Sequence, residues 1–173
     1  MARTTVLSLL CLAVLAAGSP VQGFDFASYK PGDLDEVLAM PKPKTGVDVI
    51  SLQKLALNVT LESYAQKCGL AGVIKFSMSM LPTVYHREFV NALSGSKCVK
   101  VKSLKGTTVS LAIQDKVAEF LPQEVPLGSR MTAYCVLVCM TADGPGLIVA
   151  EFQTRKAAID EQSRWVARLG TPQ

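Results

Sequence analysis

The sequence predicts an α+β, β-rich fold: a small twisted antiparallel sheet, or a partly open barrel, covered by one or two helices. The first observation is the regular alternation of apolar and polar residues over Leu55–Leu61, typical of a strand with one buried face. Two further alternating segments flank Lys105 and Gly106, and a long apolar segment ends at the turn-forming sequence Asp143–Gly146. Roughly five or six strands with this spacing fit an oligonucleotide/oligosaccharide-binding barrel, or a half-barrel packed on a helix, as architectural analogies only.

Residues 1–23 have the pattern of a secretory signal peptide. A short positively charged start is followed by the apolar run Val6–Ala17 and then by helix-breaking residues. Val21 and Gly23 occupy positions −3 and −1 of a cleavage site before Phe24. The apolar run has about half of the ~20 residues that a helix needs to cross a bilayer, and no later segment comes closer. We therefore expect a secreted or periplasmic protein with no transmembrane segment in the mature chain.

The mature chain, at about 150 residues, is long enough for one domain with its own core. We expect an N-terminal arm with a short helix over residues 24–46, and a single β-rich globular domain with a C-terminal amphipathic helix over residues 47–173. Loss of Arg3 with the leader reduces the 18 Lys and Arg residues to 17, against 14 Asp and Glu, for a formal charge of +3. A nucleic-acid-binding domain needs a stronger, one-sided basic charge, so nucleic acid is not an expected partner.

The arm is predicted to contain a helix from Leu34 to Met40. Asp33 followed by Glu36 resembles a capping box with aspartate as the cap, and Pro41 ends the helix. Aromatic residues precede this helix, and we expect them to pack on the domain as a strap: Phe24, Phe26 and Tyr29.

The middle of the chain is predicted to contain strands and a helix. Glu62–Leu81 is ambiguous, but its last part fits a strand over Val73–Leu81, and Thr83–Ser94 fits a helix with apolar residues spaced by four. A hairpin follows, with strands over Lys97–Lys102 and Thr108–Ile113, each with one apolar and one polar face.

The last third is predicted to hold the most buried strand. Asp115–Leu121 is expected to form one or two helical turns, followed by a stiff loop that begins at Pro122. Met131–Met140 has apolar residues on both faces of the expected strand, which predicts a central strand that is covered on both sides. Leu147–Phe152 is its expected partner, and Thr154–Leu169 has the pattern of an amphipathic helix.

Four cysteines remain after Cys11 leaves with the leader: Cys68, Cys98, Cys135 and Cys139. On one strand, Cys135 and Cys139 stand about 13 Å apart, whereas bridged Cα atoms lie within ~7 Å, so these two do not pair with each other. We favour a Cys68–Cys98 disulfide with Cys135 and Cys139 as buried thiols. In the alternative, both strand cysteines pair with Cys68 and Cys98. The favoured bridge closes a loop of about 30 residues, worth roughly 3 kcal/mol.

No residue is predicted to be catalytic, and no metal site or cofactor is expected. His86 is the sole histidine, and its charged neighbours favour a helix residue facing solvent or partly packed. Cys135 and Cys139, expected to point the same way along a strand, stand too far apart to chelate one ion. Asn58 begins an N-glycosylation sequon, which matters only in a eukaryotic host.

Four lysines form the most suggestive polar feature: Lys97, Lys100, Lys102 and Lys105. They are the candidate binding residues for an anionic partner, because the expected strand turns Lys100 and Lys102 to the same face. The alternative interpretation is that these lysines protect an exposed edge strand from pairing with other chains.

The function that these features favour is an exported, non-catalytic binding or accessory protein of the bacterial periplasm or cell envelope. Its expected partner is an unknown protein or an anionic envelope component. Two alternatives remain open. One is a small secreted hydrolase built from dispersed carboxylates or Cys and His residues, and the other is a secreted effector that acts on another cell.

Overall fold

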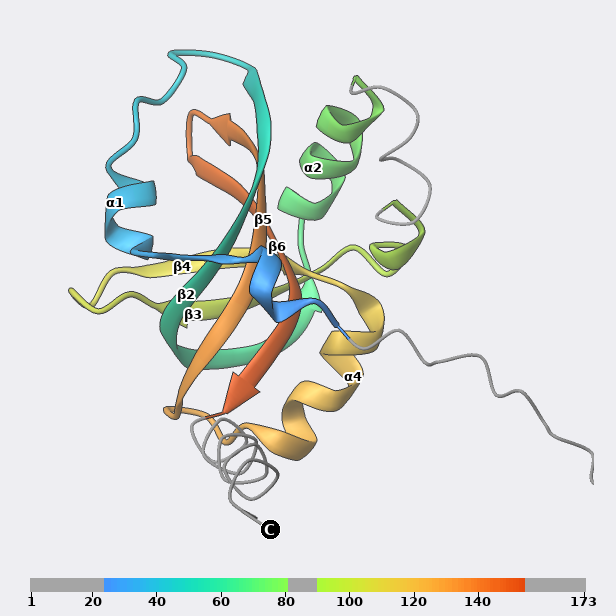
Figure 1. Ribbon diagram of the computed structural model, residues 1–173. Coiled ribbons are helices and arrows are strands. Elements are labelled where there is room, and N and C mark those ends of the chain that lie inside the picture. Colours follow the sequence, from blue (N-terminus) through green and yellow to red (C-terminus); the bar gives the residue numbers. More distant parts are fainter. Residues whose placement is uncertain (1–23, 81–89, 155–173) are drawn as a thin grey trace, which may run out of the picture.

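Five strands close into a barrel in the computed structural model, which describes residues 24–80 and 90–154 (Figure 1). The barrel strands are β2 (Val47–Lys67), β3 (Lys97–Lys102), β4 (Thr108–Ile113), β5 (Arg130–Thr141) and β6 (Gly144–Thr154). A short strand, β1 (Lys30–Gly32), pairs in parallel with β2. The helical segments are the 3-10 turn η1 (Phe26–Ser28), α1 (Leu34–Leu38), α2 (Leu70–Ser79) and α4 (Asp115–Glu124). The predicted α+β, β-rich fold is confirmed.

The barrel closes because one long strand has two different neighbours. The first part of β2 pairs with β5, from Val47 opposite Thr141 to Thr60 opposite Arg130. The rest of β2 pairs with β3, and register shifts beyond Leu61 mark the bulges at which the strand bends. The order β2-β3-β4-β6-β5 thus returns to β2, which closes the ring.

One junction of the ring is short. β4 and β6 run parallel, and their pairing covers only Ala112 with Ile148 and Ile113 with Val149. The sheet is therefore mixed, whereas the sequence pattern led us to expect antiparallel strands. It is nevertheless closed, because β2 contacts both β3 and β5.

The barrel interior is filled with aliphatic side chains and closed by two helices. Leu34 and Val37 of α1 and Val117 and Leu121 of α4 pack into the same buried cluster as the inward-facing strand residues. The fully buried strand residues of this cluster include Leu57, Leu61, Val99, Val101, Leu111, Ile113, Leu137 and Leu147. Asp33 caps α1, since its carboxylate accepts a hydrogen bond of 2.8 Å from the Asp35 N–H.

A second cluster covers the outer face of the sheet. Its described members from α2 are Ala71, Ile74 and Met78, which pack with Val138 and Ile148 of the barrel. The N-terminal aromatic residues confirm the predicted strap: the rings of Phe24, Phe26 and Tyr29 lie 4.8–5.8 Å from the Tyr134 ring, measured between centroids. Burial is the main cause that raises the pKa of Tyr29 to about 12.

The expected strand over Val73–Leu81 is wrong for its described part, because helix α2 extends to Ser79. Ile74 and Met78 are fully buried one helical turn apart, whereas Phe76 is 60% exposed and Met80 57% exposed. Apolar residues on both faces of a helix also satisfy a period of two, so the alternation did not distinguish the two structures.

The helix after β4 is longer than expected. α4 runs through Pro122 to Glu124, where we expected a stiff loop. Leu121 is fully buried and Val125 almost so, and burial of these two side chains against the barrel end outweighs the cost of a proline inside a helix.

Two further expectations fall mostly outside the described residues. The predicted helix over Thr83–Ser94, which contains His86, is described only at residues 90–94, of which 90–92 are helical. The predicted amphipathic helix over Thr154–Leu169 lies outside the described residues after Thr154. Among the helices of the described part, none is long and apolar enough to span a membrane.

Candidate functional site: a groove at the rim of the barrel

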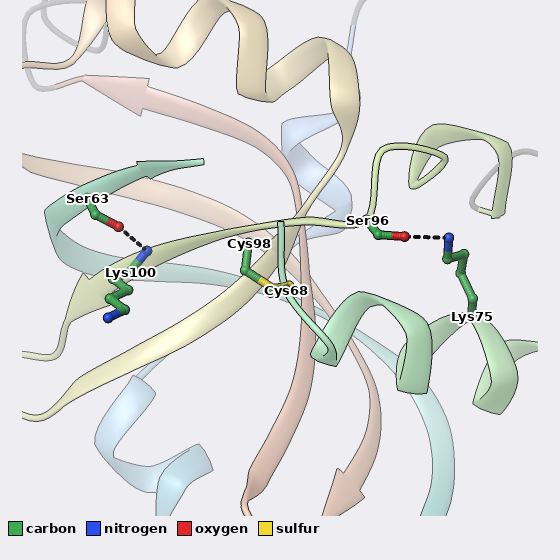
Figure 2. Close-up of a disulfide and its surroundings, with 6 residues drawn as sticks. All are labelled: Ser63, Cys68, Lys75, Ser96, Cys98 and Lys100. Carbon is green, nitrogen blue, oxygen red and sulfur yellow. Dashed lines mark hydrogen bonds between the residues drawn. A yellow bond between two sulfur atoms is a disulfide. The ribbon is translucent and has the colours of Figure 1, made fainter. Parts of the chain in front are cut away.

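The predicted disulfide is present between Cys68 and Cys98 (Figure 2). Cys68 follows the end of β2, Cys98 lies in β3, and their Cα atoms are 5.7 Å apart. Cys135 and Cys139 are free, buried thiols on β5, as favoured from the spacing. Burial raises the pKa of both thiols, so neither provides a thiolate nucleophile near neutral pH.

The two free thiols do not point the same way. Cys135 belongs to the cluster inside the barrel, and Cys139 belongs to the cluster beneath α2. A register shift between Leu137 and Cys139 in the pairing of β5 with β6 adds a residue and reverses the alternation. The expectation that both thiols share a strand face is therefore wrong, because the two side chains lie on opposite faces of the sheet.

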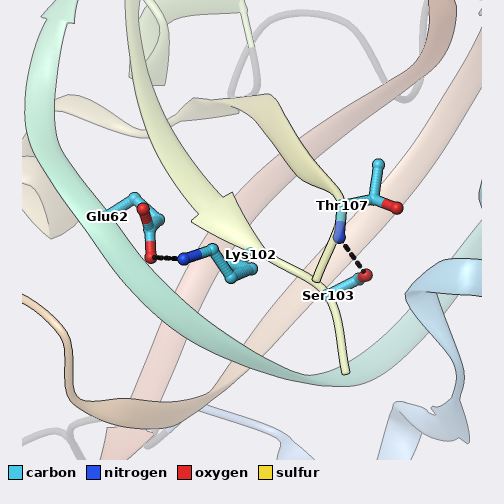
Figure 3. Close-up of polar contacts among 4 residues, drawn as sticks. All are labelled: Glu62, Lys102, Ser103 and Thr107. Carbon is cyan, nitrogen blue, oxygen red and sulfur yellow. Dashed lines mark hydrogen bonds and ion pairs between the residues drawn. The ribbon is translucent and has the colours of Figure 1, made fainter. Parts of the chain in front are cut away.

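The lysines predicted to bind an anion do not converge on one point. Lys102 pairs with Glu62, with 2.8 Å between the ammonium nitrogen and the carboxylate oxygen (Figure 3). Lys97 begins β3, whereas Lys105 lies in the turn beyond its other end. Lys100 is exposed, and the Ser63 hydroxyl accepts a hydrogen bond of 3.3 Å from its backbone N–H (Figure 2). An anionic partner stays a prediction, with Lys100 as its best-placed residue.

These lysines also do not protect a sheet edge. β3 pairs with β2 on one side and with β4 on the other. The interpretation of Lys97, Lys100 and Lys102 as edge protection is therefore wrong, because the strand that carries them has no free edge over its paired length.

The turn after β3 is held against α1. The Ser103 hydroxyl donates to the Asp35 carboxylate over 2.7 Å. The same hydroxyl accepts a hydrogen bond of 3.0 Å from the Thr107 N–H (Figure 3). The Lys105 N–H donates to the other oxygen of the Asp35 carboxylate over 3.1 Å. These bonds fix the start of β4 relative to α1.

At the other end of β3, Asp115 holds the preceding loop. Its carboxylate accepts the Ser94 hydroxyl over 2.6 Å and the Gly95 N–H over 2.9 Å. Burial opposes ionisation, but these two hydrogen bonds and the charges of Lys97 and Lys75 outweigh it and lower the pKa of Asp115 below 3.8. Lys75 in turn donates to the Ser96 hydroxyl over 2.7 Å (Figure 2). These contacts are local and position the loop.

The glycosylation sequon lies on the barrel surface. Asn58 is exposed in β2, and its side-chain oxygen accepts a hydrogen bond of 3.1 Å from the Thr132 hydroxyl. A cavity of about 380 Å³ beside it is lined by residues that include Asn58, Leu104 and Arg130.

The larger feature is a groove of about 790 Å³ at the rim of the barrel, which we call the rim groove. Its lining comes from four regions that are far apart in the sequence. These are the end of α1 with the start of β2, the start of α2, the first half of β4, and the β5–β6 turn. The lining residues that the argument below uses are Leu70, Val73, Thr108, Ser110, Asp143 and Gly144.

The chemistry of the rim groove is that of a binding surface. Leu70 and Val73 form an apolar wall on α2, and Thr108 and Ser110 contribute hydroxyl groups from β4. Among the described lining residues, Asp143 is the one charged side chain, and none is aromatic. The volume lies in the range of natural ligand pockets. Sequence reasoning identified Asp143 as part of a turn but not the groove, because no local motif joins the four regions.

Comparison with protein-family models, curated proteins and solved structures finds no significant match to this chain. Within residues 24–80 and 90–154, no group of three or more His, Cys, Asp or Glu side chains could hold a metal ion.

Proposed function

We propose that this chain is an exported, non-catalytic binding or accessory protein of the periplasm or cell envelope, and that the rim groove is its binding site. The observation that carries the proposal is the composition of this groove: an apolar wall, hydroxyl groups and a single carboxylate around about 790 Å³. General acid–base catalysis needs ionisable groups that converge on one point, and the described lining offers Asp143 alone.

Two further observations support the proposal. The pattern of residues 1–23 is that of a leader that directs export. The Cys68–Cys98 disulfide fits an oxidising compartment such as the periplasm or the extracellular space. The free cysteines are buried and have raised pKa values, so they do not supply a hydrolase nucleophile.

The test measures ligand-induced stabilisation of the mature protein. An extract of the envelope is separated into protein, lipid and glycan fractions, and each is added to wild type and to Ser110→Trp, which fills the rim groove. Glu119→Trp, on the exposed face of α4, is the matched control. A ligand at 100 times its Kd adds about 2.7 kcal/mol, which raises the Tm of a protein of this size by about 5–11 °C.

We expect one fraction to raise the Tm of wild type and Glu119→Trp but not of Ser110→Trp. A fraction that stabilises all three proteins equally would place the site elsewhere, and no shift with any fraction would remove the proposal. Intact-mass analysis of the exported protein tests the localisation separately. The expected mass corresponds to a chain that begins within about two residues of Phe24.

A further inference from the structure

The rim groove contains a free strand edge. β4 pairs with β3 over its whole length, from Thr108 opposite Lys102 to Ile113 opposite Lys97. Its other edge pairs with β6 only at Ala112 and Ile113. In the described part of the chain, residues 108–111 therefore have a strand neighbour on one side only. The start of β6 diverges from them, and residues of both strands line the groove.

The backbone groups on this edge can be assigned by alternation. The Gln114 N–H, one residue beyond β4, donates to the Val149 carbonyl of β6 over 3.1 Å. Successive residues of a strand turn their N–H and C=O groups to opposite edges, so Ala112, Ser110 and Thr108 turn theirs to the same side as Gln114. Thr108 and Ser110 are exposed. They therefore present two donors and two acceptors to the groove.

The side chains around this edge suit an extended chain with alternating contacts. Leu70 and Val73 of α2 provide an apolar wall for one set of side chains. Asp143, in the β5–β6 turn, is exposed and places a negative charge at the rim. A ligand that leaves this carboxylate solvated or pairs it with a cation is favoured over an anionic ligand.

We propose that the rim groove binds an extended peptide segment with a basic side chain, which adds to the free edge of β4 as a strand and places its cation beside Asp143. This inference rests on the proposed function and specifies its ligand. Main-chain hydrogen bonds to Thr108 and Ser110 supply the register, and the apolar wall selects alternate side chains. Single-stranded nucleic acid is disfavoured, because the described lining has no aromatic residue for stacking and no cation for phosphate.

The test uses a displayed library of random dodecapeptides selected on the mature, disulfide-bonded protein. Affinities of the selected peptides are then measured by fluorescence anisotropy for wild type and three variants. Ser110→Pro removes the N–H on the free edge, and proline is tolerated on strand edges. Ser110→Ala is its matched control, because it loses the hydroxyl but keeps the N–H. Asp143→Lys reverses the charge at the rim.

We expect enrichment of peptides with one basic residue among alternating apolar ones. Ser110→Pro should weaken their binding about tenfold more than Ser110→Ala does, since both variants lose the hydroxyl but only Ser110→Pro loses a main-chain bond and blocks the edge. Asp143→Lys should weaken binding by about tenfold, with a loss that shrinks at high salt.

A second measurement does not depend on the folding of a variant. In wild type, peptide binding should slow hydrogen exchange at the Ser110 N–H, while the Val109 N–H, which faces β3, changes little. No enriched peptide, or equal affinity for Ser110→Pro and Ser110→Ala, or unchanged exchange at Ser110, would each overturn strand addition. If a lipid or glycan fraction stabilises wild type through the groove, this inference fails and the proposed function survives. If no fraction does, both fail.

Discussion

Reduction of the Cys68–Cys98 disulfide should destabilise this protein by an amount that follows from the loop it closes. The two cysteines are 30 positions apart in the sequence. In the chain-entropy model, a bridge across a loop of that length removes about 12 cal/mol/K from the unfolded ensemble, or about 3.6 kcal/mol at 25 °C. For a chain of this size, that free energy corresponds to a fall in Tm of about 7–14 °C.

The assay compares urea unfolding of the oxidised and the reduced wild-type protein, so that no side chain is altered. The midpoint should fall on reduction, and the slope m should rise, because the reduced chain exposes more surface when it unfolds. Cys135→Ala is the control. It removes a fully buried thiol that has no bridge, so its own midpoint is lower, but the decrease on reduction should equal that of wild type.

Equal midpoints for oxidised and reduced wild type would refute this reasoning. That result would mean that the pairing of β2 with β3 already holds the ends of the loop together in the unfolded ensemble. A decrease in the free energy of unfolding well above about 5 kcal/mol would also contradict it, because the loop entropy is then too small to account for the loss.

Three further predictions concern single positions. The pKa of Asp115 is lowered, so the contribution of this carboxylate to stability is present above pH 4 and is lost as the pH falls through the lowered value. In urea unfolding at a series of pH values, Asp115→Asn should therefore lose less stability than wild type on acidification from about pH 5 to pH 2. The same dependence of stability on pH in both proteins would contradict this prediction. Gly146→Ala should destabilise by about 1–3 kcal/mol, because the added methyl group meets the Cys139 sulfur, and Cys139→Ala should restore part of that loss in a double-mutant cycle. If Lys100 binds an anionic partner, Lys100→Glu should weaken binding to acidic vesicles more at low salt than at high salt. Equal binding of wild type and Lys100→Glu at low salt would show that the lysine does not have this role.

The elements that could be predicted from the sequence are those with a single dominant signal. The β3–β4 hairpin has apolar residues on one face and polar ones on the other, so one register buries the apolar set. β5 is apolar on both faces and is covered by the barrel interior on one side and by α2 on the other. For the disulfide, distance excluded a Cys135–Cys139 bridge, and the ordinary burial of free cysteines on an apolar strand favoured Cys68–Cys98 over the alternative pairing.

The remaining features depend on tertiary packing that leaves no local trace. α2 carries buried Ile74 and exposed Phe76, so its composition does not show which face is covered. α4 continues through Pro122 because Leu121 is buried against the barrel, a contact that the local sequence does not indicate. The bulge that separates Cys135 from Cys139 has no sequence marker. The rim groove is assembled from segments that only the closed barrel brings together.

The division of β2 between two neighbours sets an order of events for folding. Its pairs with β3 join residues 30 to 42 positions apart, whereas its pairs with β5 join residues 70 to 94 positions apart. The β2–β3–β4 meander and the Cys68–Cys98 bond therefore need only the chain up to residue 113, whereas the ring cannot close without β5 and β6. We expect the non-local pairing of β2 with β5 to be the slower step, and until it forms the apolar face that β5 covers stays exposed.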